Sequence, residues 1–337
     1  MSEVTRRRVL RVSLLLAGIL ALVCLIALSL GAVAIAPQDV VAALARSLVG
    51  QADAVTSEHR LILFEIRLPR ILLAVLVGAT LSVAGAAFQA LLRNPLADHY
   101  VLGVSSGAAV GAILSMVTSQ RVTVATPFAA FAGATATIAF VYFLGSKGGQ
   151  LFRHTLLLAG IVTASFLSAI IIFLITMLSG RDLRGIAYWL MGDLSTPTPL
   201  NLRWLLLAAV AVFVFLYFSA GDLNLLLAGE QEALHLGVNV PRVKKMVYLA
   251  ASFSTGLAVS VSGAIGYVGL LVPHLVRMIF GNDYRLLIPA TALGGAILLV
   301  AADTLARTLA APTELPVGAV TALAGAPVFI YLLRRSI

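Results

Sequence analysis

Nine stretches of this chain are apolar for long enough to cross a lipid bilayer as helices, and this feature limits the possible folds most. They lie at residues 12–36, 70–91, 100–118, 123–145, 155–178, 204–220, 246–262, 286–306 and 317–333. A shorter run at 264–280 contains Gly266, Gly269 and Pro273, and such a broken span is tolerated where protein or water surrounds it. We therefore predict an all-α membrane protein with one transmembrane domain over residues 1–337 and about ten spans.

The overall composition excludes a soluble fold. Hydrophobic residues make up 61% of the chain and charged residues only 11%, whereas soluble domains carry about 25% charged residues. The net charge is +9, but the basic residues are scattered among short loops and indicate membrane topology instead of a nucleic-acid surface. Cys24 is the single cysteine, so an intrachain disulfide and a cysteine-based metal site are both excluded.

The N-terminal segment has some features of a secretory signal. Arg6, Arg7, Arg8 and Arg11 precede an apolar run, and Ala34–Ala36 has the small-x-small form of a cleavage site. The run is about 25 residues long, which exceeds the apolar region of a signal peptide. We expect an uncleaved first helix.

The distribution of lysine and arginine predicts the orientation in the membrane. With ten spans and a cytoplasmic N-terminus, fourteen of the 23 basic residues lie on the cytoplasmic side, as the positive-inside rule requires. Both termini are then cytoplasmic. Residues 37–66 become a periplasmic segment, and residues 221–245 become the longest polar segment on the cytoplasmic side.

The segment 221–245 has a pattern of its own. Leucines alternate with acidic residues and His235, and Gly229 and Gly237 interrupt the pattern, which predicts two short amphipathic helices joined by a turn. Such a pair suits the docking of a soluble partner. A solvated connecting loop is the alternative.

Motifs for catalysis are weak or absent in the sequence. The chain lacks G-x-x-x-x-G-K-[ST], so ATP-driven transport would need a separate ATPase. Gly103–Gly107 matches G-x-S-x-G around Ser105, but no strand precedes it, as a hydrolase elbow requires. We predict a protein that is not an enzyme and has no cofactor or metal of its own, with an intramembrane serine hydrolase as an alternative.

Ion-coupled transport finds little support in the sequence, because ionisable residues within the spans are scarce. Asp303 lies deepest and is four residues before Arg307, which predicts an ion pair on one helix face. A secondary transporter or channel that works without an ATPase stays open as a further alternative.

Two arginines mark the point where the periplasmic segment enters a helix. Arg67 and Arg70 share a helix face, and Pro69 suits a first helical turn. Two fixed positive charges there attract either an acidic protein or ligand, or phospholipid headgroups.

Eight ordered motifs together resemble one family from about residue 60 to the C-terminus. They are RLPR at 67–70, Gln89 with RNPLA at 93–97, LGVSSGA at 102–108, YWLMG at 188–192, LAGEQEALHLGV at 227–238, SGAIGYVGLLVPHLVR at 262–277, ADTLAR at 302–307 and ELPVGAVTALAGAPVFIYLL at 314–333. On these motifs the chain resembles the FecCD permeases, which are membrane subunits of ABC importers for vitamin B12, iron-siderophores and haem.

The resemblance implies a type II ABC importer permease in the bacterial inner membrane. The expected partners are a second copy of the chain, two cytoplasmic ATPase subunits that use ATP and Mg²⁺, and a periplasmic substrate-binding protein. Alternating access would import an iron-siderophore as first choice, a cobalamin as second or haem as third.

The resemblance also implies roles for individual residues. Arg67, Arg70 and Arg307 match the family positions that dock the binding protein. The residues that match the family's coupling helices, which contact the ATPase, include Gly229, Glu230, Ala233, Leu234, Leu236 and Gly237. The spans at 155–178 and 317–333 would line the path, with Asn94, Leu96, Arg153 and His154 at its cytoplasmic gate. Asp98–Tyr100 departs from the family, which commonly has proline where His99 stands, and this departure bears on the turn at the gate.

Overall fold

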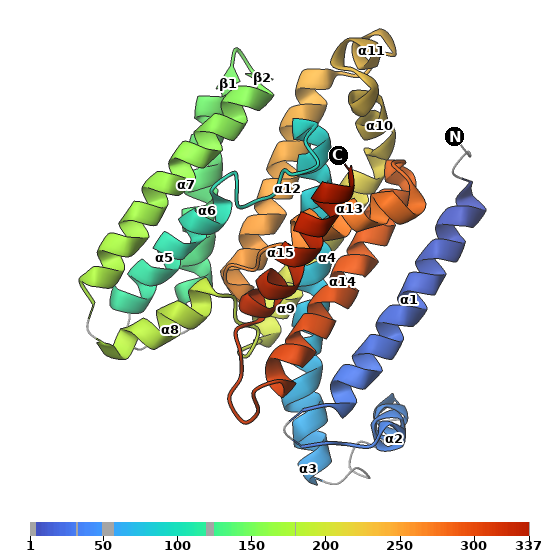
Figure 1. Cartoon of the computed structure of the whole chain (residues 1–337), viewed down its shortest axis with the longest axis vertical. Helices are drawn as coiled ribbons and strands as arrows, with labels where there is room; N and C mark the ends of the chain where they lie inside the picture. The colour runs from blue at the N-terminus through green and yellow to red at the C-terminus, as the bar shows by residue number, and fades with distance from the viewer. Residues whose placement is uncertain (1–4, 32, 49–56, 119–124, 179, 337) are drawn as a thin grey trace.

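Helices account for most of the residues that a computed structural model describes, namely 5–31, 33–48, 57–118, 125–178 and 180–336 (Figure 1). The helices are α1 (Arg6–Ser29), α2 (Pro37–Leu48), α3 (Ser57–Arg60), the π-helix η2 (Leu61–Arg67), α4 (Leu68–Leu92), α5 (Val104–Thr118), α6 (Ala125–Gly145), α7 (Arg153–Thr176), α8 (Gly180–Leu190), α9 (Pro199–Phe218), α10 (Ala220–Ala228), α11 (Glu230–His235), α12 (Val240–Ser262), α13 (Val268–Phe280), α14 (Tyr284–Thr308) and α15 (Val317–Ser336). Two short strands, β1 (Ser146–Lys147) and β2 (Gln150–Leu151), form an antiparallel hairpin before α7.

Each of the ten expected spans corresponds to a helix, namely α1, α4, α5, α6, α7, α9, α12, α13, α14 and α15. Within the described residues, five helices are long and apolar enough to cross a membrane by themselves, and the bent pair of α9 and α10 would make a sixth. Helices α5, α13 and α15 are apolar but give shorter stretches. The prediction of a helical protein that crosses the membrane several times is confirmed.

The molecule has two distinct ends (Figure 1). Both termini, the β1–β2 hairpin and α11 lie at one end, which we call the α11 end, and α2, α3 and α8 lie at the other, the α8 end. The chain termini therefore share a side with the 221–245 segment, as the count of basic residues predicted. The described parts of the periplasmic segment, residues 37–48 and 57–66, lie at the opposite side.

Helix α4 is the centre of the bundle, and it packs against α9, α12, α13 and α14. Small residues allow these backbones to approach closely. A Cβ atom added to Gly85 would lie 1.9 Å from the carbonyl oxygen of Gly269 in α13, and one added to Gly78 would lie 2.3 Å from that of Gly295 in α14. Gly269, which belongs to the motif at 262–277, thus serves helix packing.

Gly85→Ala is expected to destabilise the bundle by about 2 kcal/mol or more, because α4 and α13 must separate to admit the methyl group. Thermal unfolding in detergent would measure the loss. Gly18→Ala is the matched control, since a Cβ there meets no atom within 4 Å and should leave the melting temperature unchanged. Equal melting temperatures for the two variants would contradict the packing argument.

Four features of the helices differ from what the sequence predicted. The periplasmic segment is helical where it is described, as α2, α3 and η2, and η2 runs directly into α4. Helix α1 ends at Ser29, before residue 36, because Leu30 adopts an extended conformation. Helix α8 was not expected. Helix α12 begins at Val240, where the side chain of Asn239 accepts a hydrogen bond from the backbone N–H of Arg242, so the coupling segment ends earlier than residue 245.

Candidate functional site

The predicted ion pair within α14 is part of a larger buried cluster at the α8 end. Asp303 is 1% exposed and accepts hydrogen bonds from two arginines. Arg307 Nε lies 3.0 Å from Asp303 Oδ2, and Arg70 Nε from α4 lies 2.9 Å from Asp303 Oδ1. The pairing of Asp303 with Arg307 is confirmed, and Arg70 joins it across 233 positions of sequence.

Arg307 and a third arginine, Arg67, also cover the end of α1. Arg67 donates to the backbone carbonyl oxygens of Leu28 and Val33, and Arg307 Nη2 donates to that of Ala27 at 3.3 Å. Carbonyl groups in the last turn of a helix lack intrahelical partners and favour positive charge. Arg67 and Arg307 therefore hold the end of α1 against the junction of η2 with α4 and against α14.

Glu314 completes the arginine cluster from the loop between α14 and α15. Its carboxylate lies 2.7 Å from Arg70 Nη1, and its side chain is 45% exposed. Three guanidinium groups face two carboxylates, which leaves one excess positive charge at this end. Arg67, Arg70 and Arg307 are brought together as predicted, but their side chains are buried and internally paired, so they do not form an open positive surface. Their docking role stays a prediction.

The α10–α11 pair at the α11 end matches the two short helices expected within 221–245. Ala233 is fully buried and anchors α11, whereas Leu234 and Leu236 are 54% and 66% exposed. Gly237 has a φ of 84°, a left-handed conformation that favours glycine, and this turn ends the helix as the N–H of Val238 donates to the carbonyl of Ala233. The pair therefore exposes apolar side chains on α11, a short helix whose C-terminus is capped.

Gly229 and Glu230 form the junction between the two helices. Gly229 is buried, and Glu230 begins α11 and reaches back to Lys244 in α12. Leu226, in the last turn of α10, accepts a hydrogen bond from Arg93 Nε at 2.8 Å. The junction is thus tied to the helical bundle by two cations, Lys244 and Arg93.

The candidate gate residues lie in two segments. Asn94 and Leu96 follow α4, where the side chain of Asn94 accepts a hydrogen bond from the backbone N–H of Leu96 at 2.9 Å and leaves Leu96 exposed. Arg153 and His154 begin α7 just after the hairpin. Among the described residues, hydrogen bonds do not join one pair to the other. The gate assignment stays a prediction.

The departure at Asp98–Tyr100 lies next to the broken span. His99 is fully buried, and its ring is near Gly269 at the start of α13. A Cβ on Gly269 would meet both Asp98 Oδ1 and His99 Nδ1. Asp98 and His99 are therefore packed against α13, whereas the side chain of Tyr100 is exposed.

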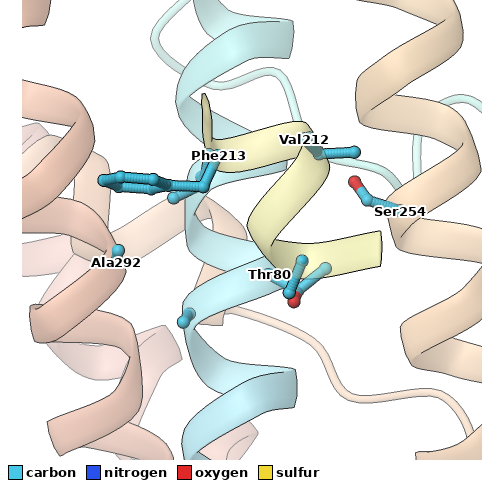
Figure 2. Close-up of a pocket in the computed structure, with 8 residues that line it drawn as sticks. Thr80, Val212, Phe213, Ser254 and Ala292 are labelled. Atoms are coloured by element: carbon cyan, nitrogen blue, oxygen red, sulfur yellow. The ribbon is translucent and has the colours of Figure 1, made fainter. Parts of the chain in front are cut away.

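A small cavity between α4, α9, α12 and α14 is too small to carry a large solute. Thr80, Val212, Phe213, Ser254 and Ala292 line it (Figure 2). Its volume is about 30 Å³, which suits a single water molecule.

Two helices that the sequence analysis placed along the path leave large apolar faces uncovered. Helix α7 exposes Leu158, Phe166 and Phe173, and α15 exposes Leu323 and Ile330. Lipid or a second protein surface must cover these side chains. A passage between two copies is compatible with this arrangement.

Comparison with known proteins gives consistent results across sequence and structure. A family model described as the FecCD transport family matches residues 19–335. The chain is 47% identical over 269 residues to the cobalamin import system permease protein BtuC of Halobacterium salinarum, covering 80% of this chain and 72% of that protein. It is 45% identical to the hemin transport system permease protein HmuU of Yersinia pestis, covering 80% and 82%.

A solved structure agrees over almost the whole length. It is described as an inward-facing conformation of a transporter of the metal-chelate ABC type, and it superposes with a TM-score of 0.82. The alignment covers 97% of this chain and 99% of the other, at 29% identity. The fold is therefore shared with that transporter over almost the whole chain.

Proposed function

Because the chain belongs to the FecCD transport family, we propose that it is the membrane permease subunit of an ATP-driven importer in the bacterial inner membrane. The observation that carries the proposal is the family match over residues 19–335, with the exposed leucines of α11 at the end that holds both termini. By the positive-inside rule this end faces the cytoplasm, where an ATPase would dock. The α8 end then faces the binding protein.

The cargo is a large metal complex. Iron-siderophore was the first expectation from the sequence, but the relatives named above are permeases for cobalamin and hemin. We therefore place cobalamin first, ahead of haem and an iron-siderophore. A passage between two apolar faces suits such a cargo, because strong specific contacts would hold a large solute in place.

The proposed cycle is alternating access. ATP binding closes two ATPase subunits, α10 and α11 move with them, and two copies of the permease rock against each other. The passage exchanges an opening at the α8 end for one at the α11 end. The apolar faces of α7 and α15 line it, and the binding protein supplies the specificity.

Reconstitution tests the proposed function. Proteoliposomes that hold the permease, its ABC ATPase and its binding protein should accumulate radiolabelled cobalamin, haemin or a ferric siderophore only when ATP is present. Proteoliposomes with the permease alone are the control. Uptake by the permease alone would favour a secondary transporter or channel and overturn the proposal. The serine hydrolase alternative is opposed by Ser105, which is buried in the first turn of α5.

Docking of the binding protein makes a separate prediction at Glu314. A carboxylate of the docking protein reaches Arg70 only where the Glu314 carboxylate now lies, since Arg70 is otherwise buried. Glu314→Gln should therefore strengthen docking several-fold at low salt, with a smaller gain at high salt. Binding measured in nanodiscs by surface plasmon resonance checks this.

Glu65→Gln, an exposed acid of η2 at the same end, is the matched control for a general change in charge. Identical affinities for the two variants would contradict a docking role for Arg70. Charge reversal at Arg67 is a poorer test, because that side chain holds the end of α1.

A further inference from the structure

We propose that Lys244 and Arg93 are positioning residues that transmit movement of the α10–α11 pair to the two segments that carry the candidate gate. The inference rests on the proposed function, since it gives α10–α11 a moving partner. It adds a mechanical connection that neither the motifs nor the relatives assign.

Lys244 joins three segments at one buried point. It lies in the first turns of α12 and is 6% exposed. Its Nζ donates to the backbone carbonyl of Leu151 at 2.7 Å and contacts the two carboxylate oxygens of Glu230 at 3.1 and 3.2 Å. An ammonium group has three donors, and here each has an oxygen within reach.

The burial of Lys244 explains why the connection is stiff. An ammonium that loses its partners inside a protein carries a large desolvation cost. When α11 is displaced, Glu230 and Leu151 therefore move with Lys244, or the bridge breaks at that cost. Leu151 ends β2, and Arg153 begins α7 two residues later. A displacement of α11 thus reaches the first turn of α7.

Arg93 makes the second connection. It ends α4 in a left-handed conformation with a φ of 47°, and its guanidinium donates to the carbonyl of Leu226 at 2.8 Å through Nε and also through Nη2. Carbonyls in the last turn of a helix lack intrahelical partners, so Arg93 completes α10. Asn94 and the exposed Leu96 follow directly.

A third contact fixes the middle of α10, so that this helix can pivot but cannot move freely. The side chain of Asn224 donates to Asp283 Oδ1 at 2.8 Å and accepts from the backbone N–H of Tyr284 at 2.9 Å. These bonds fix the middle of α10 to the start of α14. A displacement of α11 then rotates α10 about Asn224. Lys244 and Arg93 transmit this movement to α7 and to the turn after α4.

The experiment compares Lys244→Met with Lys245→Met in the full complex in proteoliposomes. Lys245 is the adjacent lysine, is exposed, and has its ammonium 5.8 Å from the centre of the Tyr142 ring. We expect Lys244→Met to keep the ATPase bound and hydrolysing ATP while the cobalamin moved per ATP falls about tenfold. Lys245→Met should match the unmodified protein. Arg93→Met should behave like Lys244→Met.

A second readout is independent of the cargo. Hydrogen exchange at residues 146–151 should change when magnesium, ATP and vanadate are added to the unmodified complex, and the change should disappear in Lys244→Met. If that variant does not fold, Glu230→Gln weakens the α11 side of the bridge and should reduce the same response. An undiminished change in hydrogen exchange in a folded variant would overturn the proposed transmission through Lys244, which we call the relay.

The outcomes separate the two proposals. An unmodified complex that hydrolyses ATP but moves none of the tested cargoes would count against the proposed cargo, and hydrogen exchange would still decide on the relay. Normal transport per ATP in Lys244→Met would overturn the relay and leave the importer proposal intact.

Discussion

Leu234→Glu combined with Leu236→Glu is expected to weaken binding of the partner ATPase by at least about a hundredfold, because two exposed apolar anchors are replaced by charges. A few fully desolvated side chains near the centre of an interface commonly contribute most of its binding energy, and a charge placed there must be desolvated as well. The measurement is co-purification of the ATPase with the tagged permease, followed by titration in nanodiscs. Transport should be lost with it.

Gln231→Glu is the matched control for the coupling surface, since it adds a negative charge to an exposed position of α11 and removes no apolar contact. It should bind the ATPase nearly as well as the unmodified chain. Undiminished co-purification of the double leucine variant would contradict ATPase docking at α11. Glu230 is a less informative position for this test, because its carboxylate bridges to Lys244 within the chain.

Asp303→Ala is expected to cost about 3–5 kcal/mol of stability, because it leaves two buried guanidinium groups without their shared carboxylate. Arg70 would keep Glu314, but Arg307 would keep only its bond to the carbonyl of Ala27. The variant should give a low yield of monodisperse protein and a much lower melting temperature in detergent.

Glu65→Gln serves as the control at the same end of the molecule, because Glu65 is exposed. It should change the melting temperature little, as single exposed charges usually do. If Asp303→Ala melted at the same temperature as this control, the cluster would not be a stabilising element. Recovery of stability in Asp303→Ala combined with Arg307→Met would support the unpaired-charge explanation.

The spans and the coupling pair were predictable from local sequence. A run of about twenty apolar residues is most stable in lipid as a helix, so ten helices could be placed, with boundary errors of up to seven residues at α1. The leucine pattern and two glycines placed α10 and α11. The pairing of Asp303 with Arg307 followed from their spacing of four on a helix.

The partners of Arg70 and Lys244 were not predictable in this way. Arg70 meets residues 233 and 244 positions away, and Lys244 meets a carbonyl 93 positions away. Sequence periodicity carries information about neighbours within one or two turns, and it carries none about which distant helix lies alongside. The arginines therefore looked like an open positive surface, and Lys244 looked like one of a pair of topology markers.

From the amino-acid sequence one could predict that this protein is a helical bundle in a membrane, that both termini lie at the same end, and that residues 221–245 contain a short helical pair. These properties depend on hydrophobicity and spacing along one segment. The tertiary structure alone decided which charges are buried together and which stay exposed. Burial depends on the packing of α4 against α13 and α14, where glycines let the backbones touch and bring distant charges within bonding distance.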